Sequence, residues 1–141
     1  MDFNLEELNP GVTFFFDDPD ESKGSVTLRV CPPDELTRIE KITDEVKVKY
    51  RRGQRHEYKE RDDKKFDLML WDYTIVDWSG VTANQTPLAC TDENKQRLMG
   101  GSAWFAGFVA DKLEVLGEIQ AKRDKDREKN WSSTQSDDSA G

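Results

Sequence analysis

Apolar and polar residues alternate in two segments near the N-terminus. Residues 12–16 form a β-branched and aromatic run, and in residues 25–30 Val and Leu alternate with Thr and Arg. The stretch between them, 17–24, is rich in residues that favour turns. This pattern predicts an antiparallel β-hairpin with an open loop. Three consecutive Phe residues, 14–16, place aromatic rings on both faces, which suits a strand covered on both sides or an exposed aromatic ring that awaits a partner.

A short helix is predicted next. It opens at Pro33, because proline at the first helical position loses no hydrogen bond. Leu36, Ile39 and Ile42 then follow on one face, so we expect the helix to end near Ile42.

Alternation returns in residues 45–50, where Val46, Val48 and Tyr50 are separated by charged residues. Residues 51–54 contain a glycine and can turn the chain back through residues 55–58. A second hairpin is the favoured interpretation. A loop or an extension of the helix is the alternative, because strands with so many charges depend on their context.

Helical spacing is clearest in residues 66–78. Large apolar side chains recur there at steps of three and four residues, which places most of them on one side of a helix. They are Phe66, Met69, Leu70, Tyr73, Ile75, Val76 and Trp78. We expect this helix to begin near Asp62 or Asp63, whose carboxylates suit its first turn, and to end at Ser79-Gly80. Pro87 keeps the loop that follows extended.

Two more helices complete the predicted fold. Thr91 is an expected N-cap because two acidic residues follow it in the first turn, and this helix ends at the glycines 100–101. Ser102 then caps the longest helix, residues 103 to about 129. Trp104 and Val115 lie to the side of its apolar stripe, which comprises Phe105, Phe108, Val109, Leu113, Leu116 and Ile119.

These elements predict a mainly helical α+β fold in which an N-terminal hairpin, with a possible second hairpin, packs on three to four helices. Residues 1–10 are expected to be a flexible lead-in and residues 11–121 a single globular domain. Residues 122–141 are expected to form a charged helix extension and then a disordered polar tail, beginning at Ser132.

Composition excludes several classes of function. A net charge of −8 argues against general binding to phosphate backbones, so no nucleic-acid partner is expected. No apolar run approaches the ~20 residues that span a bilayer, and the N-terminus lacks a signal-peptide pattern. The only two cysteines, Cys31 and Cys90, are isolated, which favours a reducing compartment. We therefore expect a soluble, cytosolic protein without a membrane partner.

One segment resembles a known family. The sequence Ile-Val-Asp-Trp-Ser-Gly-Val at 75–81, a short loop ending in Pro-Leu, and then Thr-Asp-Glu-Asn-Lys at 91–95 is similar to the signature region of tail assembly chaperones from long-tailed bacteriophages. The family layout of a strand pair, a helical middle, a Trp-Gly loop and a closing helix is similar over residues 11 to 125. Many relatives place a glycine in the loop before Pro-Leu, whereas this chain has none in residues 82–86, where Asn84 can adopt the left-handed conformation instead.

The resemblance implies a function and partners. Such a chaperone binds the tape measure protein, helps to recruit tail tube subunits, acts in the host bacterial cytoplasm and is absent from the mature virion; it is also a possible homo-oligomer. The first alternative is a structural tail completion or connector protein of the virion.

No enzymatic pattern is evident. A small metal- or thiol-dependent enzyme would have to use Cys31, His56 and Cys90, but metal ligands normally occur in close pairs and no two of these are near one another. We expect no catalytic, cofactor-binding or metal-binding residues.

The remaining candidate chemistry is the binding of another protein by the longest helix. Its apolar stripe is expected to pack on the helix predicted in residues 66–78 and on the strand pair. The alternative is that part of the stripe, with Trp104 or Trp131, forms a groove for a partner's amphipathic helix, and both can hold if one side is buried and the other is used. The candidate partner-binding residues are Trp104, Phe105, Phe108, Val109, Leu113 and Trp131.

Overall fold

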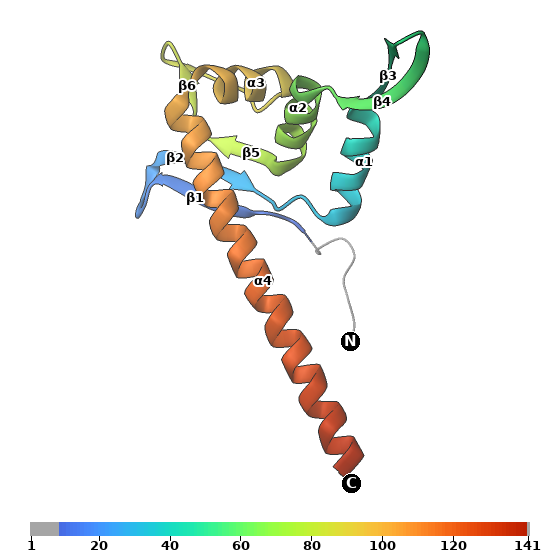
Figure 1. The fold of residues 1–141 in the computed structure, drawn as a ribbon. Coiled ribbons are helices and arrows are strands. Elements are labelled where there is room, and N and C mark those ends of the chain that lie inside the picture. The colour runs from blue at the N-terminus through green and yellow to red at the C-terminus, as the bar shows by residue number, and fades with distance from the viewer. Residues whose placement is uncertain (1–8, 141) are drawn as a thin grey trace.

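The fold is built around an antiparallel sheet of three strands, in which two neighbouring N-terminal strands pair with a third that lies much later in the sequence. The computed structural model describes the backbone of residues 9–140, and it describes side chains up to residue 125 apart from residues 120, 123 and 124. The strands are β1 (Val12–Asp17), β2 (Asp20–Leu28) and β5 (Ile75–Ser79), in the order β1-β2-β5 (Figure 1). Phe14 pairs with Val26, and Val26 pairs with Trp78. The side chains of these paired residues lie on one face, and that face packs against the long helix α4 (Ala103–Ala140).

The predicted N-terminal hairpin is confirmed, but its predicted open loop is wrong. Only Asp18 and Pro19 separate β1 from β2, and β2 begins at Asp20 instead of Ser25. Asp17 pairs with Asp20 after a shift in register between Phe15 and Asp17, so most of the polar residues that were assigned to the loop belong to an irregular part of β2. Strand pairing outweighs the turn preference of these residues, because β propensity depends strongly on context.

The helix predicted to reach Trp78 ends earlier, at Thr74, so that prediction was wrong. This helix, α2, spans Asp63–Thr74 and is capped by Asp62, whose side chain accepts a hydrogen bond from Lys65 N. The β-branched Ile75 then begins β5, in which Ile75 and Trp78 are buried and Val76 is exposed. Over residues 75–78 the spacing of apolar side chains fits a helix and a strand equally well. The segment becomes a strand because its backbone can pair with the free edge of β2.

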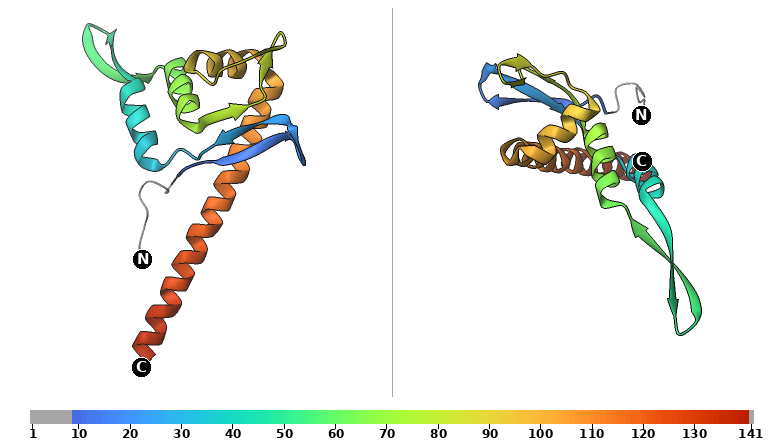
Figure 2. Two further views of the ribbon diagram at one scale, coloured as in Figure 1. Left: turned by 180° about the vertical axis from the view of Figure 1, so that it is seen from behind. Right: turned by 90° about the horizontal axis from the view of Figure 1, so that it is seen from above.

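The predicted first helix and the second hairpin are confirmed. Helix α1 spans Pro33–Thr43, and the hairpin consists of β3 (Asp44–Arg51) and β4 (Gln54–Arg61). Figure 2 shows that this hairpin stands away from the rest of the molecule, and every residue from 45 to 61 is exposed. We call it the arm. Arg52 and Gly53 both have positive φ, 52° and 76°, as the two-residue turn of a twisted hairpin requires.

Helices α3 (Asp92–Gly101) and α4 have the predicted caps. Thr91 Oγ1 accepts from Asn94 N at 3.3 Å, and Ser102 Oγ accepts from Phe105 N at 3.1 Å. Helix α4 crosses the sheet and continues well beyond it (Figure 1). The structure traces it to Ala140, instead of ending it near residue 129 before a disordered tail, because neither Gly nor Pro interrupts residues 118–140.

The fold is therefore α+β, as expected. The described residues form seven strands beside the four helices, so the description as mainly helical understates the strands. Residues 1–8 of the expected lead-in lie outside the described residues. Asn9 is held against the rest of the fold, since its Nδ2 donates to Val30 O at 2.7 Å and to the Tyr73 hydroxyl at 3.3 Å.

Candidate functional site

The tryptophan of the family-like segment is a structural residue. Trp78 is almost fully buried, its indole Nε1–H donates to Leu88 O at 2.7 Å, and its ring meets the Phe105 ring edge-on at 5.9 Å between centroids. A buried indole N–H requires such a partner. Trp78 thus joins β5 to the Pro-Leu segment and to α4.

The glycine of this segment permits a close approach between two strands. Gly80 has φ +71°, and a Cβ at this position would lie 2.8 Å from the Cα of Gly24. The short hairpin that follows consists of β6 (Thr82–Ala83) and β7 (Thr86–Pro87). Its turn residues Asn84 and Gln85 have φ of 51° and 66°, so the expectation of a left-handed Asn84 is confirmed.

The Thr-Asp-Glu-Asn-Lys residues fasten α3 to its neighbours. Asn94 Nδ2 donates to Ala89 O at 2.9 Å, and the nearly buried Lys95 donates through Nζ to both Asp72 O and Asp72 Oδ1, each at 3.2 Å. A hydrogen bond with Asp92 lowers the pKa of Asp72, and the same bond raises the pKa of Asp92. The segment that carries the resemblance therefore holds the fold together, and a binding surface has to be sought elsewhere.

One stripe of α4 belongs to the core. Phe105 is 4% exposed, Val109 and Leu116 are also buried, and Leu113 is half-buried against them. These side chains pack on Val26, Leu28, Ile75 and Trp78. Of the predicted partner-binding residues, Phe105 and Val109 are thus covered within this chain and cannot contact a partner unless the core opens. The side chain of Trp131 lies outside the described residues.

A second stripe runs along the adjacent flank of α4 and stays accessible. Trp104 is 62% exposed, Val115 41% and Ile119 44%, and the ring of Phe108 is half-buried. These residues follow one another at steps of four, seven and four, which keeps them on one side of a helix. We call them the α4 surface stripe. Val115 and Ile119 were not among the predicted partner-binding residues, because the sequence does not show which apolar flank meets the sheet.

An aromatic cluster holds the N-terminal end of this stripe. Trp104 and Phe108 stack at 5.5 Å, and Phe16 of β1 packs edge-on against both, at 5.8 Å and 5.2 Å between centroids. Lys112 Nζ lies 5.5 Å from the centre of the Phe108 ring and 5.7 Å from that of Phe14. One member of the Phe triplet thus has a structural role, because Phe16 packs against the exposed indole of Trp104 and holds its ring in place. The aromatic side chains at this end of the α4 surface stripe are therefore held in place by contacts within the chain.

A separate hollow lies between α2 and α3. It has a volume of about 360 Å³, and Leu68 and Trp71 contribute its apolar wall. Charges of both signs surround it, including Lys64, Glu93 and Arg97. A hollow of this kind is less suited to an apolar helix than the α4 surface stripe.

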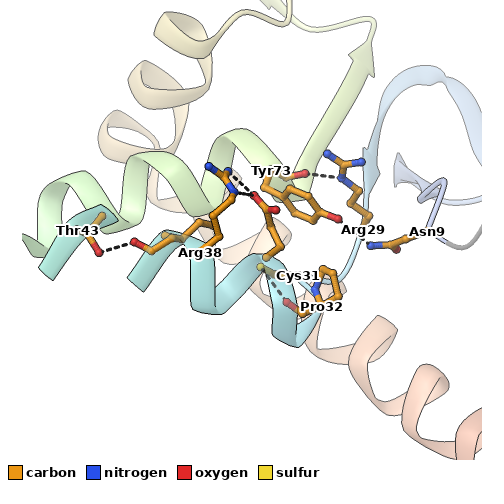
Figure 3. Close-up of polar contacts among 9 residues, drawn as sticks. Asn9, Arg29, Cys31, Pro32, Arg38, Thr43 and Tyr73 are labelled. Carbon is orange, nitrogen blue, oxygen red and sulfur yellow. Dashed lines mark hydrogen bonds and ion pairs between the residues drawn. The ribbon is translucent and has the colours of Figure 1, made fainter. Parts of the chain in front are cut away.

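The residues considered for an enzyme lie on different elements. Cys31 precedes α1, where its Sγ donates to Pro32 O at 3.9 Å (Figure 3), His56 is on the arm, and Cys90 packs on the core before α3. Burial raises the pKa of both thiols. Among the residues that the structure describes, no group of three or more His, Cys, Asp or Glu side chains could hold a metal ion.

Comparisons with protein-family models, with curated proteins and with solved structures found no match. Within the described part of the chain, no helix has both the length and the apolar character needed to cross a membrane.

Proposed function

We propose that this protein is a tail assembly chaperone of a long-tailed bacteriophage and that its α4 surface stripe binds apolar helical faces of the tape measure protein. Two independent features support the proposal: the resemblance of residues 75–95 to the signature region of that family, and an exposed apolar stripe. The stripe is the observation that carries the binding site, because Trp104 is 62% exposed on a helix whose other apolar flank is buried.

The dimensions of the stripe suit a helical partner. Trp104 and Ile119 are fifteen residues apart, which corresponds to ~22 Å along a helix at 1.5 Å per residue. A partner helix would therefore contact it over about four turns, through residues at positions i, i+3, i+4 and i+7. Trp104 and Phe108 would supply the aromatic anchor that usually dominates such an interface.

The chemistry suits temporary protection. A tape measure protein is long and helical and carries apolar stripes, which aggregate if they remain exposed. Many moderate contacts, each using one copy of the α4 surface stripe, can cover those stripes and then be displaced as tail tube subunits assemble around the same partner. This reaction takes place in the host cytoplasm and leaves the chaperone outside the finished virion.

Co-expression with the tape measure protein encoded by the same phage genome tests the proposal. The wild-type chain should keep the partner soluble and co-purify with it. Trp104→Ala should weaken that binding by about 2 kcal/mol, the usual threshold for an aromatic hot spot. Tyr50→Ala is the matched control, since it removes another exposed aromatic ring, on the arm, and should leave binding unchanged.

A tape measure protein that remains insoluble, with nothing co-purifying, would show that the proposed function is wrong. Detection of the chain in purified virions at stoichiometric amounts would instead support a completion or connector protein. If the wild type and Trp104→Ala bind equally well, the function could stand, but the site would have to be moved from the α4 surface stripe.

A further inference from the structure

The arm concentrates positive charge in an acidic protein. Residues 44–61 contain seven Lys or Arg and four Asp or Glu, a formal charge of +3 in a chain of net charge −8. The outer half is more extreme, since residues 46–56 contain five Lys or Arg and no acidic residue. The net charge therefore describes the body of the molecule and misrepresents the arm.

The register of the arm divides its side chains between two faces. On one face, Val46, Val48 and Tyr50 are paired with Lys59, Glu57 and Arg55. On the other, Lys47, Lys49 and Arg51 are paired with Tyr58, His56 and Gln54. Because paired residues of an antiparallel ladder point to the same side, apolar side chains gather on the first face and cations on the second.

The second face is hollowed. Lys49, Arg51, His56 and Tyr58 line a space of about 400 Å³, and Arg51, Arg52, Gln54 and His56 line a neighbouring space of about 560 Å³. We call Lys49, Arg51, Arg52, His56 and Tyr58 the basic face. It presents cations beside one aromatic ring, with room for a ligand between them.

Most of the positive charge on this face is uncompensated. On this face Lys47 forms an ion pair with Glu60 at 2.8 Å, whereas the ion pair of Arg55 with Glu57, at 3.2 Å, lies on the opposite face. Lys49, Arg51 and Arg52 form no ion pair with any residue that the structure describes. These three cations face solvent and are free to neutralise an anionic ligand.

The acidic body is too far from the end of the arm to oppose this. Each strand of the arm has eight residues, so the arm extends ~26 Å at ~3.3 Å per residue. At physiological salt, charges are screened over a Debye length of ~8 Å. The electrostatic potential at the tip of the arm is therefore set mainly by Lys49, Arg51 and Arg52.

We infer that the basic face binds single-stranded nucleic acid, with backbone phosphates on Lys49, Arg51 and Arg52 and one base stacked on the ring of Tyr58. Guanidinium groups match phosphate oxygens in a two-pronged geometry, and a base offers a flat π-surface to an exposed tyrosine. An acidic protein segment is a poorer occupant. Its carboxylates could pair with the cations, but it would leave the exposed ring of Tyr58 without the flat partner that a base supplies.

This inference does not depend on the proposed function. It is tested by fluorescence anisotropy of the full chain with a labelled twelve-nucleotide oligothymidylate, titrated at several salt concentrations. Three neutralised phosphates predict a slope of about −2 for log K against log salt, at ~0.7 per phosphate of a single strand. The double variant Lys49→Gln, Arg51→Gln should bind more weakly, and the magnitude of its salt slope should fall below about 1.

The aromatic contact has its own variant. Tyr58→Ala should weaken binding by roughly 5- to 100-fold without changing the salt slope, and Tyr58→Phe should retain affinity because stacking does not need the hydroxyl. The double variant Lys64→Gln, Arg97→Gln is the matched control. It removes the same number of exposed cations from the α2–α3 hollow and should bind like the wild type.

Three outcomes would overturn the inference. The first is no binding of the oligonucleotide at low salt, and the second is an equal loss of affinity in the control and arm variants. The third is displacement of the labelled oligonucleotide by a poly-aspartate peptide as effectively as by unlabelled oligonucleotide of the same charge. The last result would assign the basic face to an acidic protein partner instead. Tyr58→Ala with wild-type affinity would contradict the stacking contact.

Discussion

The approach of Gly24 and Gly80 allows a direct test of the way in which β2 and β5 meet. In Gly80→Ala the new Cβ would lie 2.8 Å from the Cα of Gly24 and 3.4 Å from its N. Both neighbours are backbone atoms, so no side chain can rotate away to relieve the overlap. The residue also keeps φ at +71°, where an L-amino acid is strained.

The magnitude has two parts. The left-handed conformation costs a non-glycine residue ~1–2 kcal/mol, and forcing a methyl group into a closely packed site costs a further ~1–3 kcal/mol. We expect Gly80→Ala to lower the free energy of unfolding by about 3 kcal/mol, which for a chain of this size corresponds to a fall of roughly 10 °C in Tm.

Two other glycines separate these parts. Gly53, in the turn of the arm, has φ +76° but nothing within 4 Å of its Cβ position, so Gly53→Ala carries only the conformational penalty and should cost ~1–2 kcal/mol. Gly107, inside α4, has neither strain nor neighbours, so Gly107→Ala should stabilise the protein by about 0.5–1 kcal/mol.

Urea unfolding followed by circular dichroism and tryptophan fluorescence gives the three free energies. The expected order of stability is Gly107→Ala, wild type, Gly53→Ala and Gly80→Ala. If Gly80→Ala is no less stable than Gly53→Ala, the two strands do not approach as closely as described, and the structural role assigned to this glycine fails.

Three further predictions concern the α2–α3–α4 region. Lys95→Met preserves volume but removes both hydrogen bonds to Asp72, so it should cost about 1–2 kcal/mol in urea unfolding; wild-type stability would contradict the contact. The hydrogen bond between the two carboxyl groups raises the pKa of Asp92, so the stability that protonated Asp92 contributes is complete below the ordinary aspartate pKa and is lost as pH rises through the raised pKa. The same bond lowers the pKa of Asp72, so ionised Asp72 contributes stability above the ordinary aspartate pKa. Asp92→Asn cannot ionise, so its Tm relative to the wild type should increase between pH 4 and 7, and a constant difference would refute the pairing. Ser102→Ala removes the cap on Phe105 N and should cost about 1 kcal/mol, measured by thermal unfolding, whereas Ser79→Ala, at an exposed serine that caps no helix, should leave Tm nearly unchanged.

Local features were readable without the fold. The caps Thr91 and Ser102, the start of α1 at Pro33 and the left-handed Asn84 depend on backbone groups a few residues away. The charged arm could also be predicted, because alternation and a turn glycine are both local signals. Such features involve short-range hydrogen bonds and backbone preferences, which the order of residues specifies directly.

The end of α2 could not be read in the same way. Residues 75–78 satisfy both helical and strand spacing, and the deciding partner, β2, is about fifty residues earlier in the chain. The accessible flank of α4 is a similar case. Phe105 and Trp104 are adjacent aromatic residues, yet one is in the core and the other is exposed, because only the position of the sheet determines which side is covered.

The amino-acid sequence by itself determined that there are four helices and two N-terminal hairpins, the caps Thr91 and Ser102, and the family-like segment, since each depends on neighbours along the chain. Only the tertiary structure decided which apolar flank of α4 stays open and that the basic arm stands away from the acidic remainder of the molecule. The physical reason is the same in both cases. Burial and electrostatic potential depend on distances in space, and a sum over the sequence, such as a net charge of −8, averages over regions that the fold separates.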